Sequence, residues 1–241
     1  MVGHPIGEFY GYKTNGLFQT DAEADNFTFK DKDGKIQRVQ PGAKAGDVRY
    51  VDANGDGQWD RDFMGSPHPK FNAGLNLELA YKGFDVSGMF TVVYGNKVFN
   101  GPCYYTENSS AYWNLDTRML NSWTPSNPTN DVRYPRLNIN DQNNTRVSDR
   151  FIEDGSYGRL KNLQVGYTLD ASVTKKFWVQ KCRIYVGAEN LLTLTKYTGL
   201  DPEIGIWGDV QGVVNQSLSV GIDRGIYPQG RTFFVGLNLT L

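Results

Sequence analysis

The chain has 241 residues, of which 39% are hydrophobic and 21% are charged, and its formal net charge is -1. A balance this close to neutral leaves no basic surplus to neutralise phosphates, which excludes nucleic acid as an expected partner. The mean hydropathy is -0.50, and no run approaches the about 20 consecutive apolar residues of a membrane-spanning helix. Mean hydropathy does not detect the strands of a membrane barrel, because only alternate residues of such a strand face lipid.

Six segments alternate between apolar and polar residues with the period of two that predicts β-strands. In chain order they are residues 6–13, which is the weakest, and residues 70–81, 84–94, 157–169, 182–190 and 232–241. The last segment has about the 9–11 residues that a tilted strand needs to cross a bilayer.

The connections between these segments alternate in length. Lys82 and Gly83 form a tight turn and residues 170–181 a modest link, whereas residues 14–69, 95–156 and 192–230 are long. Structureless loops of that size are uncommon in compact soluble domains, but barrels of the outer membrane combine short periplasmic turns with long extracellular loops. If the last strand runs toward the periplasm, all three long loops fall outside. The pattern predicts an all-β fold, an antiparallel transmembrane β-barrel segment.

Six strands do not close a barrel, since the smallest barrels have about 8. Open strand edges are not tolerated in lipid, so we expect strands outside this sequence to complete the barrel. Residues 2–13 also lack the basic and apolar regions of a secretory signal peptide. We therefore expect this sequence to be a piece of a longer exported protein.

Several blocks carry a family resemblance in this order along the chain. They include residues 6–12 (IGEFYGY), 46–57 (GDVRYVDANGDG), 81–85 (YKGFD), 149–157 (DRFIEDGSY), 190–192 (NLL) and 227–229 (YPQ). Together the blocks extend over nearly the whole chain, which resembles the C-terminal third or less of the SusC/RagA family of TonB-dependent transporters. The resemblance implies that residues 1–241 are the C-terminal portion of the barrel domain, without the plug domain and the N-terminal strands.

The resemblance further implies a function in nutrient uptake across the bacterial outer membrane. Members of the family have barrels of about 22 strands with a plug in the lumen. They import glycans or peptides, draw energy from TonB through the N-terminal part that is missing here, and work with a SusD-type surface lipoprotein. The expected further partners are outer-membrane lipid and the barrel-assembly machinery, and no enzymatic activity is expected.

One acidic stretch resembles a calcium-binding loop, with alternating oxygen ligands and a glycine, Gly57, at the sixth position. Its expected ligands are Asp52, Asn54, Asp56, Gln58, Asp60 and Asp62. The twelfth position holds Phe63 instead of a bidentate acid, so Asp62 must reach the metal from one place earlier. The loop is therefore either a Ca²⁺ site that stiffens an extracellular loop or a solvated acidic turn with Asn-Gly and Asp-Gly geometry.

Aromatic and acidic residues of the long loops are candidates for substrate contact. The aromatic ones are Tyr104, Tyr105, Tyr112, Trp113 and Trp207. Exposed rings of this kind either stack on sugars or pack against other loops or the lipoprotein. The acidic pairs Glu153-Asp154 and Asp201/Glu203 raise the possibility of glycosidase chemistry. Both pairs lie at loop ends, where acids are common, so we expect no catalysis.

The final segment has one apolar face, formed by Phe233, Val235, Leu237, Leu239 and Leu241. The resemblance implies that this alternation is the signal for barrel assembly, although Leu241 stands where the family usually ends in an aromatic residue. The competing interpretation is a secreted β-sandwich that binds carbohydrate with calcium, in which Val86 and Leu237 would face a protein core instead of lipid. An enzyme acting on polysaccharide is a third interpretation, and it lacks a convincing acid/base pair.

Overall fold

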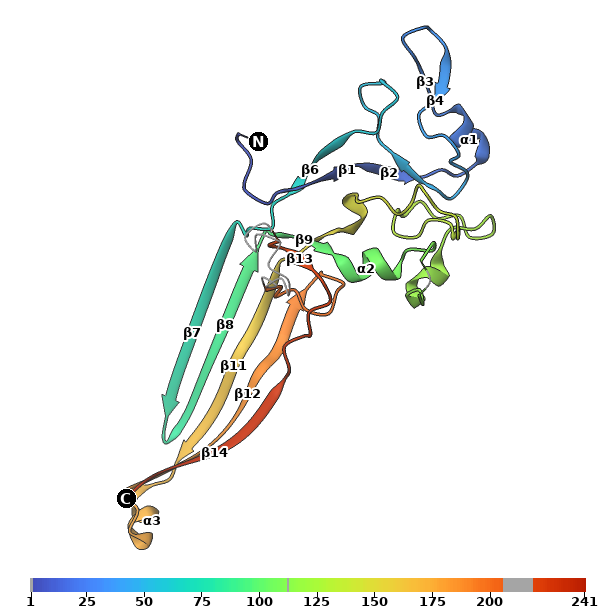
Figure 1. Cartoon of the computed structure of the whole chain (residues 1–241). Coiled ribbons are helices and arrows are strands. Elements are labelled where there is room, and N and C mark those ends of the chain that lie inside the picture. The colour runs from blue at the N-terminus through green and yellow to red at the C-terminus, as the bar shows by residue number, and fades with distance from the viewer. Residues whose placement is uncertain (1, 112, 206–218) are drawn as a thin grey trace, which may run out of the picture. The chain divides into compact units, whose positions relative to one another are not determined.

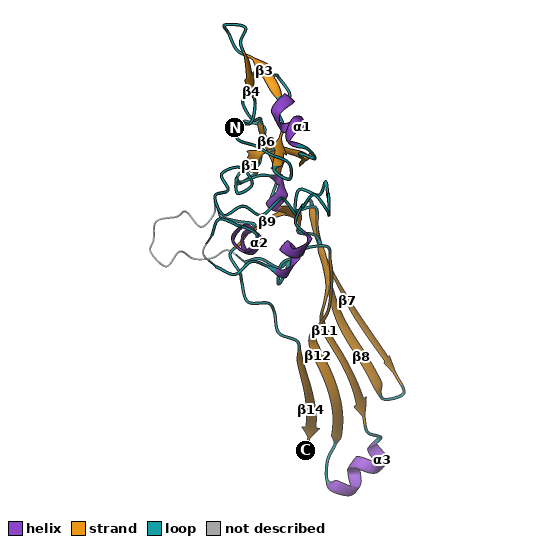
Figure 2. Cartoon of the chain, turned by 90° about the vertical axis from the view of Figure 1, so that its right-hand side faces the viewer, coloured by secondary structure: helices purple, strands orange, loops and turns teal. Residues whose placement is uncertain are grey.

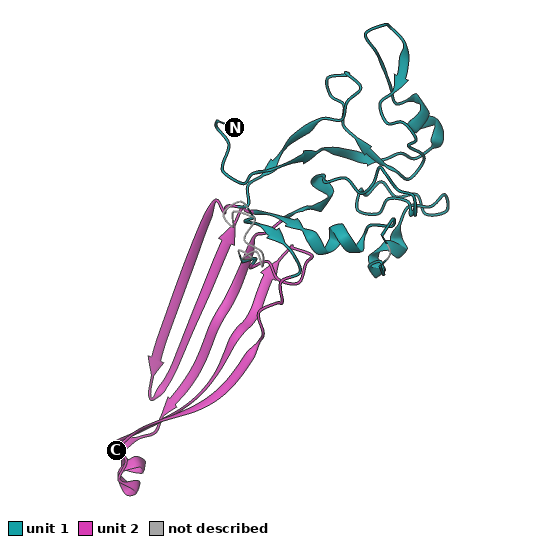
Figure 3. Cartoon of the chain, in the orientation of Figure 1, with its two compact units in different colours: residues 1–67, 97–153, 204–225 teal, residues 68–96, 154–203, 226–241 magenta. Residues whose placement is uncertain are grey.

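The computed structural model describes residues 2–111, 113–205 and 219–241, and the chain divides into two compact units (Figure 3). Unit 1 comprises Met1–Pro67, Lys97–Glu153 and Ile204–Gly225. Unit 2 comprises His68–Asn96, Asp154–Glu203 and Ile226–Leu241. Over the ranges that the structure describes, none of the helices has the length and apolar character needed to span a membrane.

Unit 2 is built on a five-stranded antiparallel sheet with the order β14-β12-β11-β8-β7 (Figure 1). Its strands are β7 (Phe71–Tyr81), β8 (Phe84–Tyr94), β11 (Tyr157–Thr168), β12 (Lys181–Thr195) and β14 (Thr232–Thr240). The link between β11 and β12 forms the short helix α3 (Ala171–Thr174) and the 3-10 helix η3 (Lys175–Phe177). Five of the six expected strands are therefore confirmed.

The expected difference between the two ends of the sheet is also confirmed. The chain passes between the units at the starts of β7, β11 and β14 and at the ends of β8 and β12. In an antiparallel sheet these positions lie at the same end, so all long connections leave from one end. The Lys82-Gly83 turn and the α3–η3 link both lie at the other end.

The tight turn between β7 and β8 follows directly from its sequence. Tyr81 pairs with Phe84, and both turn residues have left-handed backbones, with φ of 47° at Lys82 and 85° at Gly83. A two-residue hairpin turn with two positive φ values matches the right-handed twist of its strands. A Cβ on Gly83 would lie 2.8 Å from the carbonyl oxygen of Thr168, so glycine fits best there.

The first of the expected strands does not join this sheet. Within residues 6–13 only β1 (Phe9–Tyr12) forms, and it pairs with β6 (Arg61–Gly65) as a two-stranded sheet in unit 1. The physical reason is the packing of Tyr12, whose ring contacts Tyr50 and Trp59 edge-on, with ring centroids 5.7 Å away in each case. Tyr12 thus packs against the apolar core of unit 1, whereas Ile6 and Tyr10 are exposed.

The long connections are not structureless, because they contain short strands and helices (Figure 2). Most of their residues belong to unit 1. Its other strands are β2 (Thr14–Leu17), β3 (Thr28–Lys30), β4 (Ile36–Arg38), β5 (Val48–Tyr50), β9 (Lys97–Asn100), β10 (Ile152–Asp154) and β13 (Ile222–Asp223). Its helices are α1 (Asp21–Asn26), α2 (Gly101–Thr106), η1 (Thr117–Asn121) and η2 (Asp149–Phe151). The main apolar cluster is small, and its buried members are Leu17, Val48, Tyr50 and Trp123.

Candidate functional site: a two-faced sheet and its loop anchors

One face of the sheet in unit 2 is apolar across all five strands. Residues directly opposite each other in an antiparallel pair lie on the same face. One such row consists of Leu79, Val86, Val165, Val186 and Val235. The side chains at its two ends are 60% and 77% exposed within this chain. A continuous apolar surface left exposed in this way marks an interaction face, with another protein or with a membrane.

Aromatic pairs border this apolar face at both ends. Phe71 and Tyr94 lie side by side at one end, with ring centroids 5.4 Å apart, and Phe84 and Tyr167 at the other, 4.5 Å apart. From the first to the last residue of β7, the rise of about 3.3 Å per residue gives about 33 Å. With a barrel tilt of about 40°, that length corresponds to about 25 Å, the height of the apolar band of outer-membrane barrels.

The opposite face carries polar side chains, some of which form ion pairs across strands. The Arg183 guanidinium on β12 donates from Nε to Asp85 Oδ1 on β8 at 2.9 Å and pairs with the second carboxylate oxygen as well. It also donates to Gln164 Oε1 at 3.0 Å. This bidentate pair passes over β11 at Gly166, where a Cβ would lie 2.5 Å from Nη2. Glycine at this position therefore permits the pair.

A second ionic cluster anchors the connection between β12 and β14 to the sheet. Arg159 on β11 is 2% exposed and donates to Asp201 Oδ1 at 2.6 Å and to Glu203 Oε2 at 2.8 Å. The other oxygen of Asp201 accepts the backbone N–H of Gln229 at 2.9 Å. Lys161 also pairs with Glu203. Arg159 thus holds both stems of the connection, and these acids serve as anchors.

The charge state of Asp201 supports this anchoring role. Burial alone would raise its pKa, but the backbone N–H groups of Gln229 and Glu203, together with the Arg159 guanidinium, lower the pKa below its usual value. Hydrogen bonds and a positive charge favour the ionised form of a carboxyl group. Asp201 is therefore a carboxylate across the physiological pH range, as its ion pair with Arg159 requires.

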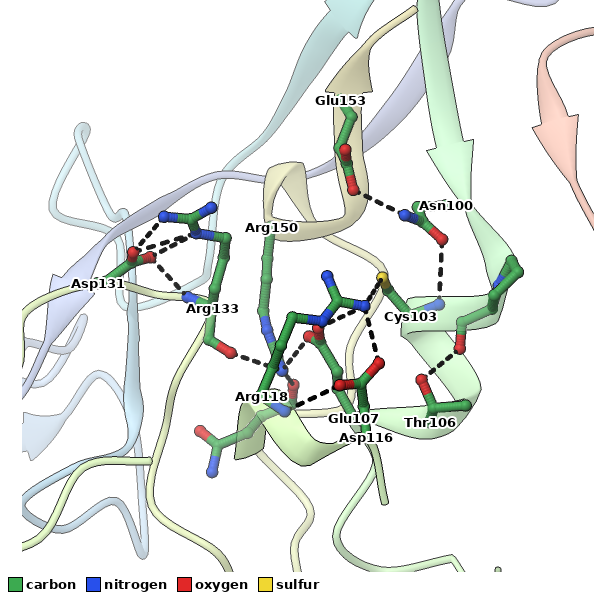
Figure 4. A network of polar contacts seen from close by, with 12 residues as sticks. Asn100, Cys103, Thr106, Glu107, Asp116, Arg118, Asp131, Arg133, Arg150 and Glu153 are labelled. Carbon is green, nitrogen blue, oxygen red and sulfur yellow. Dashed lines mark hydrogen bonds and ion pairs between the residues drawn. The ribbon is translucent and has the colours of Figure 1, made fainter. Parts of the chain in front are cut away.

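In unit 1, a buried polar network joins segments of the second long connection (Figure 4). The Arg150 guanidinium donates to Glu107 Oε2 at 3.0 Å and to the backbone carbonyl of Asn144 at 2.9 Å. Arg118 approaches the same carboxylate and donates to Cys103 Sγ at 3.1 Å. Burial raises the pKa of Glu107, although both arginines oppose that effect. We interpret the network as structural, since its buried members Arg150 and Glu107 pair with each other.

Both cysteines are free, and Cys103 is poorly suited to reaction. Burial raises the pKa of the Cys103 thiol to about 11, and the nearby Glu107 acts in the same direction. A thiol with so high a pKa is a weak nucleophile at neutral pH. The acids at residues 153 and 154 also have hydrogen-bond partners: Glu153 accepts from the Asn100 amide at 2.7 Å, and Asp154 accepts from the Ser156 hydroxyl at 2.6 Å.

The calcium-like loop directs its side-chain oxygens at its own backbone. Asp52 accepts the N–H groups of Gly55 and Gly57, at 2.8 and 3.0 Å. Asp62 pairs with Lys13 at 2.7 Å. Three more of the expected ligands, Asn54, Asp56 and Asp60, also accept backbone N–H groups of the loop. Within the described ranges, no three His, Cys, Asp or Glu side chains converge as metal ligands. This arrangement is that of an acidic turn, and calcium binding by it stays a prediction.

The predicted aromatic residues have different environments. Tyr104 packs against Phe99 and Phe151, with ring centroids 5.8 and 5.2 Å apart. Tyr105 and Trp113 are 56% and 54% exposed and meet edge-on. The indole N–H of Trp113 donates to the Tyr105 carbonyl at 2.8 Å, which fixes this pair. Tyr112 and Trp207 lie outside the described residues. Contact of any of these rings with a substrate stays a prediction.

The predicted assembly signal lies on β14 and at the residue that follows it. Phe233, Val235, Leu237 and Leu239 alternate along the strand, and all are more than half exposed. On one side β14 pairs with β12. In the part of the chain that the structure describes, its other side has no strand partner. Recognition of these residues and Leu241 by the assembly machinery stays a prediction.

Comparison with known proteins gives relatives of one kind. No protein-family model matches the chain. TonB-dependent receptor P3 of Formosa agariphila is 36% identical over 242 residues, which is 98% of this chain and 22% of that receptor. TonB-dependent receptor SusC of Bacteroides thetaiotaomicron is 28% identical over 194 residues, or 79% of this chain and 17% of that receptor. The chain therefore spans less than a quarter of the length of these relatives.

The fold leads to the same kind of protein. A solved structure of the RagAB peptide importer in its closed-closed state superposes with a TM-score of 0.65 at 25% identity, over 96% of this chain and 23% of that one. An antiparallel sheet with one apolar and one polar face, and with all long connections at one end, has the pattern of an outer-membrane barrel wall. The relatives with which the chain aligns are TonB-dependent receptors. Among these receptors, the chain is similar to SusC and to the RagAB importer, as a segment of their barrels. The family resemblance of the sequence is thereby confirmed.

Proposed function

We propose that this chain forms part of the wall and outer loops of a bacterial outer-membrane importer that takes up glycans or peptides. The importer draws energy from TonB and works with a SusD-type surface lipoprotein. Two relatives support this proposal: SusC is a TonB-dependent receptor, and RagAB is a peptide importer. The position of residues 1–241 at the C-terminal end of the barrel is part of the same proposal.

The observation that carries the proposal is the apolar face of the sheet. Its height of about 25 Å between two aromatic borders fits the hydrocarbon region of an outer membrane. Among the described residues, β7 and β14 each have one edge without a strand partner. These edges need further strands, because unpaired backbone groups are not tolerated in lipid. We infer that the rest of the receptor supplies these strands, and that the polar face lines the lumen.

We propose that aromatic side chains of the long loops contact the transported glycan or peptide. Tyr105 and Trp113 present a fixed and half-exposed pair of rings. Such rings stack on the apolar faces of sugars and on peptide side chains. Tyr104 is held by its own neighbours, so we assign it to the support of this pair.

The β-sandwich interpretation has less support. A sandwich needs a second sheet packed about 10 Å from the first. Among the described residues of unit 2 there is a single sheet, and apolar side chains such as Val235 remain exposed. The enzyme interpretation has no support in the relatives, which are receptors and importers. The acidic pairs give it none either, since Glu153 is bonded to Asn100 and Asp201 to Arg159.

Labelling of single cysteines tests the proposal. Leu237→Cys and Asn238→Cys are neighbours on opposite faces of β14, and each is placed in the full-length receptor after Cys103 and Cys182 are changed to alanine. In native membranes, we expect a lipid-soluble maleimide to label position 237 and a membrane-impermeant one to label position 238. Labelling of position 237 by the water-soluble reagent alone would show that this face is not in lipid.

A further inference from the structure

The end of the sheet with the two short links exposes large aromatic side chains. Figure 1 shows α3 beyond the ends of the strands at this end. Trp178 is 93% exposed, and both Phe177 and Tyr81 are 71% exposed. Indole and phenyl rings are among the side chains that contribute most to interfaces when buried. Their exposure at one place indicates a surface that is covered in the assembled protein.

Hydrogen bonds hold the link in this conformation, so the exposure is not the result of a loose end. The Asp170 carboxylate caps α3 by accepting the backbone N–H of Ser172 at 2.8 Å. Thr174 is 3% exposed, and its carbonyl accepts the N–H of Val179. Gln180 donates to the carbonyl of Thr240 on β14 at 2.8 Å. The two aromatic residues therefore project from an ordered link.

The same end is basic. Lys82, Lys175, Lys176 and Lys181 are all exposed. The turn and the link are neighbours, because the N–H of Thr168 donates to the carbonyl of Gly83 at 2.7 Å. The ammonium group of Lys82 lies 5.2 Å from the ring centre of Tyr81. The nearby acids are engaged, since Asp170 caps α3 and Asp85 pairs with Arg183.

We propose that this basic and aromatic end is a docking surface for the anionic headgroups of a phospholipid leaflet. The inference rests on the proposed function, which places the adjoining apolar face in lipid. The row of Tyr81, Phe84 and Tyr167 ends that face, so the surface continues an interface with lipid. Phe177 and Trp178 lie at the level of the headgroups, where aromatic rings are favoured.

The lysines supply the selectivity for anionic lipid. A lysine near an anionic membrane surface contributes about 1 kcal/mol, which corresponds to a preference of about fivefold. Lys82, Lys175 and Lys176 together give a preference of about a hundredfold for docking of the link on an anionic surface. Lysine also suits this place because its long apolar stem lies along the acyl boundary while its ammonium group reaches the phosphates.

Fluorescence quenching in vesicles tests the proposal. The full-length receptor and its Trp178→Phe variant are reconstituted in phosphatidylcholine, with and without phosphatidylglycerol, and the difference in emission reports Trp178. We expect lipids brominated near the headgroup to quench this emission more strongly when phosphatidylglycerol is present. The triple variant Lys82→Gln, Lys175→Gln, Lys176→Gln should lose most of that increase. A matched triple variant in unit 1, Lys30→Gln, Lys32→Gln, Lys35→Gln, should keep it.

Two results would overturn the inference. One is quenching of Trp178 by aqueous acrylamide, but not by brominated lipid, in both kinds of vesicle. The other is an unchanged effect of phosphatidylglycerol in the first triple variant, which would show that the lysines do not bind headgroups. If Leu237→Cys is labelled from lipid in the same preparation, either result contradicts the docking surface alone and leaves the proposed function in place.

Discussion

Replacement of Arg159 by methionine removes the anchor of the connection between β12 and β14. Arg159 is 2% exposed, and the substitution leaves Asp201 as a buried carboxylate without its positive partner. Removal of one partner from a buried ion pair costs about 3–5 kcal/mol. We expect the lower end, about 3 kcal/mol, because the Glu203 side chain is 34% exposed. Water therefore hydrates its carboxylate once the Arg159 guanidinium is gone.

Hydrogen exchange at single amides measures this loss. The N–H groups of Gln229 and Glu203 both donate to Asp201, so their protection reports the anchor directly. A loss of about 3 kcal/mol corresponds to exchange about a hundredfold faster at these two amides. Amides in the middle of β12, such as that of Val186, should keep their protection.

Arg133→Met is the matched control. Arg133 pairs with Asp131 in unit 1, but its side chain is 57% exposed, and exposed pairs contribute about 0–1 kcal/mol. Exchange at Gln229 and Glu203 should be unchanged in this variant. If Arg159→Met leaves both amides as protected as in the native protein, the connection is held by other contacts and our account of the anchor is wrong.

Four further outcomes are expected. Gly166→Ala places a Cβ 2.5 Å from the Arg183 guanidinium and should lower the stability of the barrel by about 1–3 kcal/mol, measured by thermal unfolding with Gly74→Ala as the control in open space. Cys103, with a pKa of about 11, should resist iodoacetamide in the native receptor at pH 8, where about one thiol in a thousand is ionised, and rapid alkylation would contradict this environment. Acid should weaken the Asp201 anchor, because the pKa of Asp201 is lower in the folded protein than in the unfolded chain. The stabilisation is complete above the unfolded pKa of about 4 and is lost as the pH falls through the folded pKa. Hydrogen exchange at the Gln229 amide measures this loss. If the acidic loop binds calcium, titration calorimetry of the full-length receptor should show a site that Asp52→Asn weakens, and identical isotherms would favour the acidic turn.

The strands of unit 2 were predictable because their signal is local. Alternation in residues such as Leu75, Leu77 and Leu79 sets both the strand and the face that each side chain occupies. The prediction for the β12 segment ended at Asn190, where the backbone has φ of 50° and the register with β11 shifts. The strand continues beyond that irregularity to Thr195, and a period of two does not reveal a continuation across a shift in register.

Unit 1 and the anchors were not predictable, because their contacts join residues far apart in the chain. Arg136 pairs with Asp47, and Asn144 accepts the N–H of Val48, over separations of 89 and 96 residues. Nothing in the local pattern around these residues indicates such partners. Asp201 and Glu203 stood out as a pair of acids, but their partner Arg159 lies on a strand more than forty residues earlier.

The central claim is that this chain is one part of the wall of an outer-membrane receptor. Mass spectrometry of fractionated source cells tests it most directly, by locating peptides of this sequence and the size of the polypeptide that carries them. Since the chain spans 22% of the P3 receptor, we predict an outer-membrane polypeptide about four to five times larger than 27.1 kDa. A free species of 27.1 kDa in a soluble fraction would contradict the account.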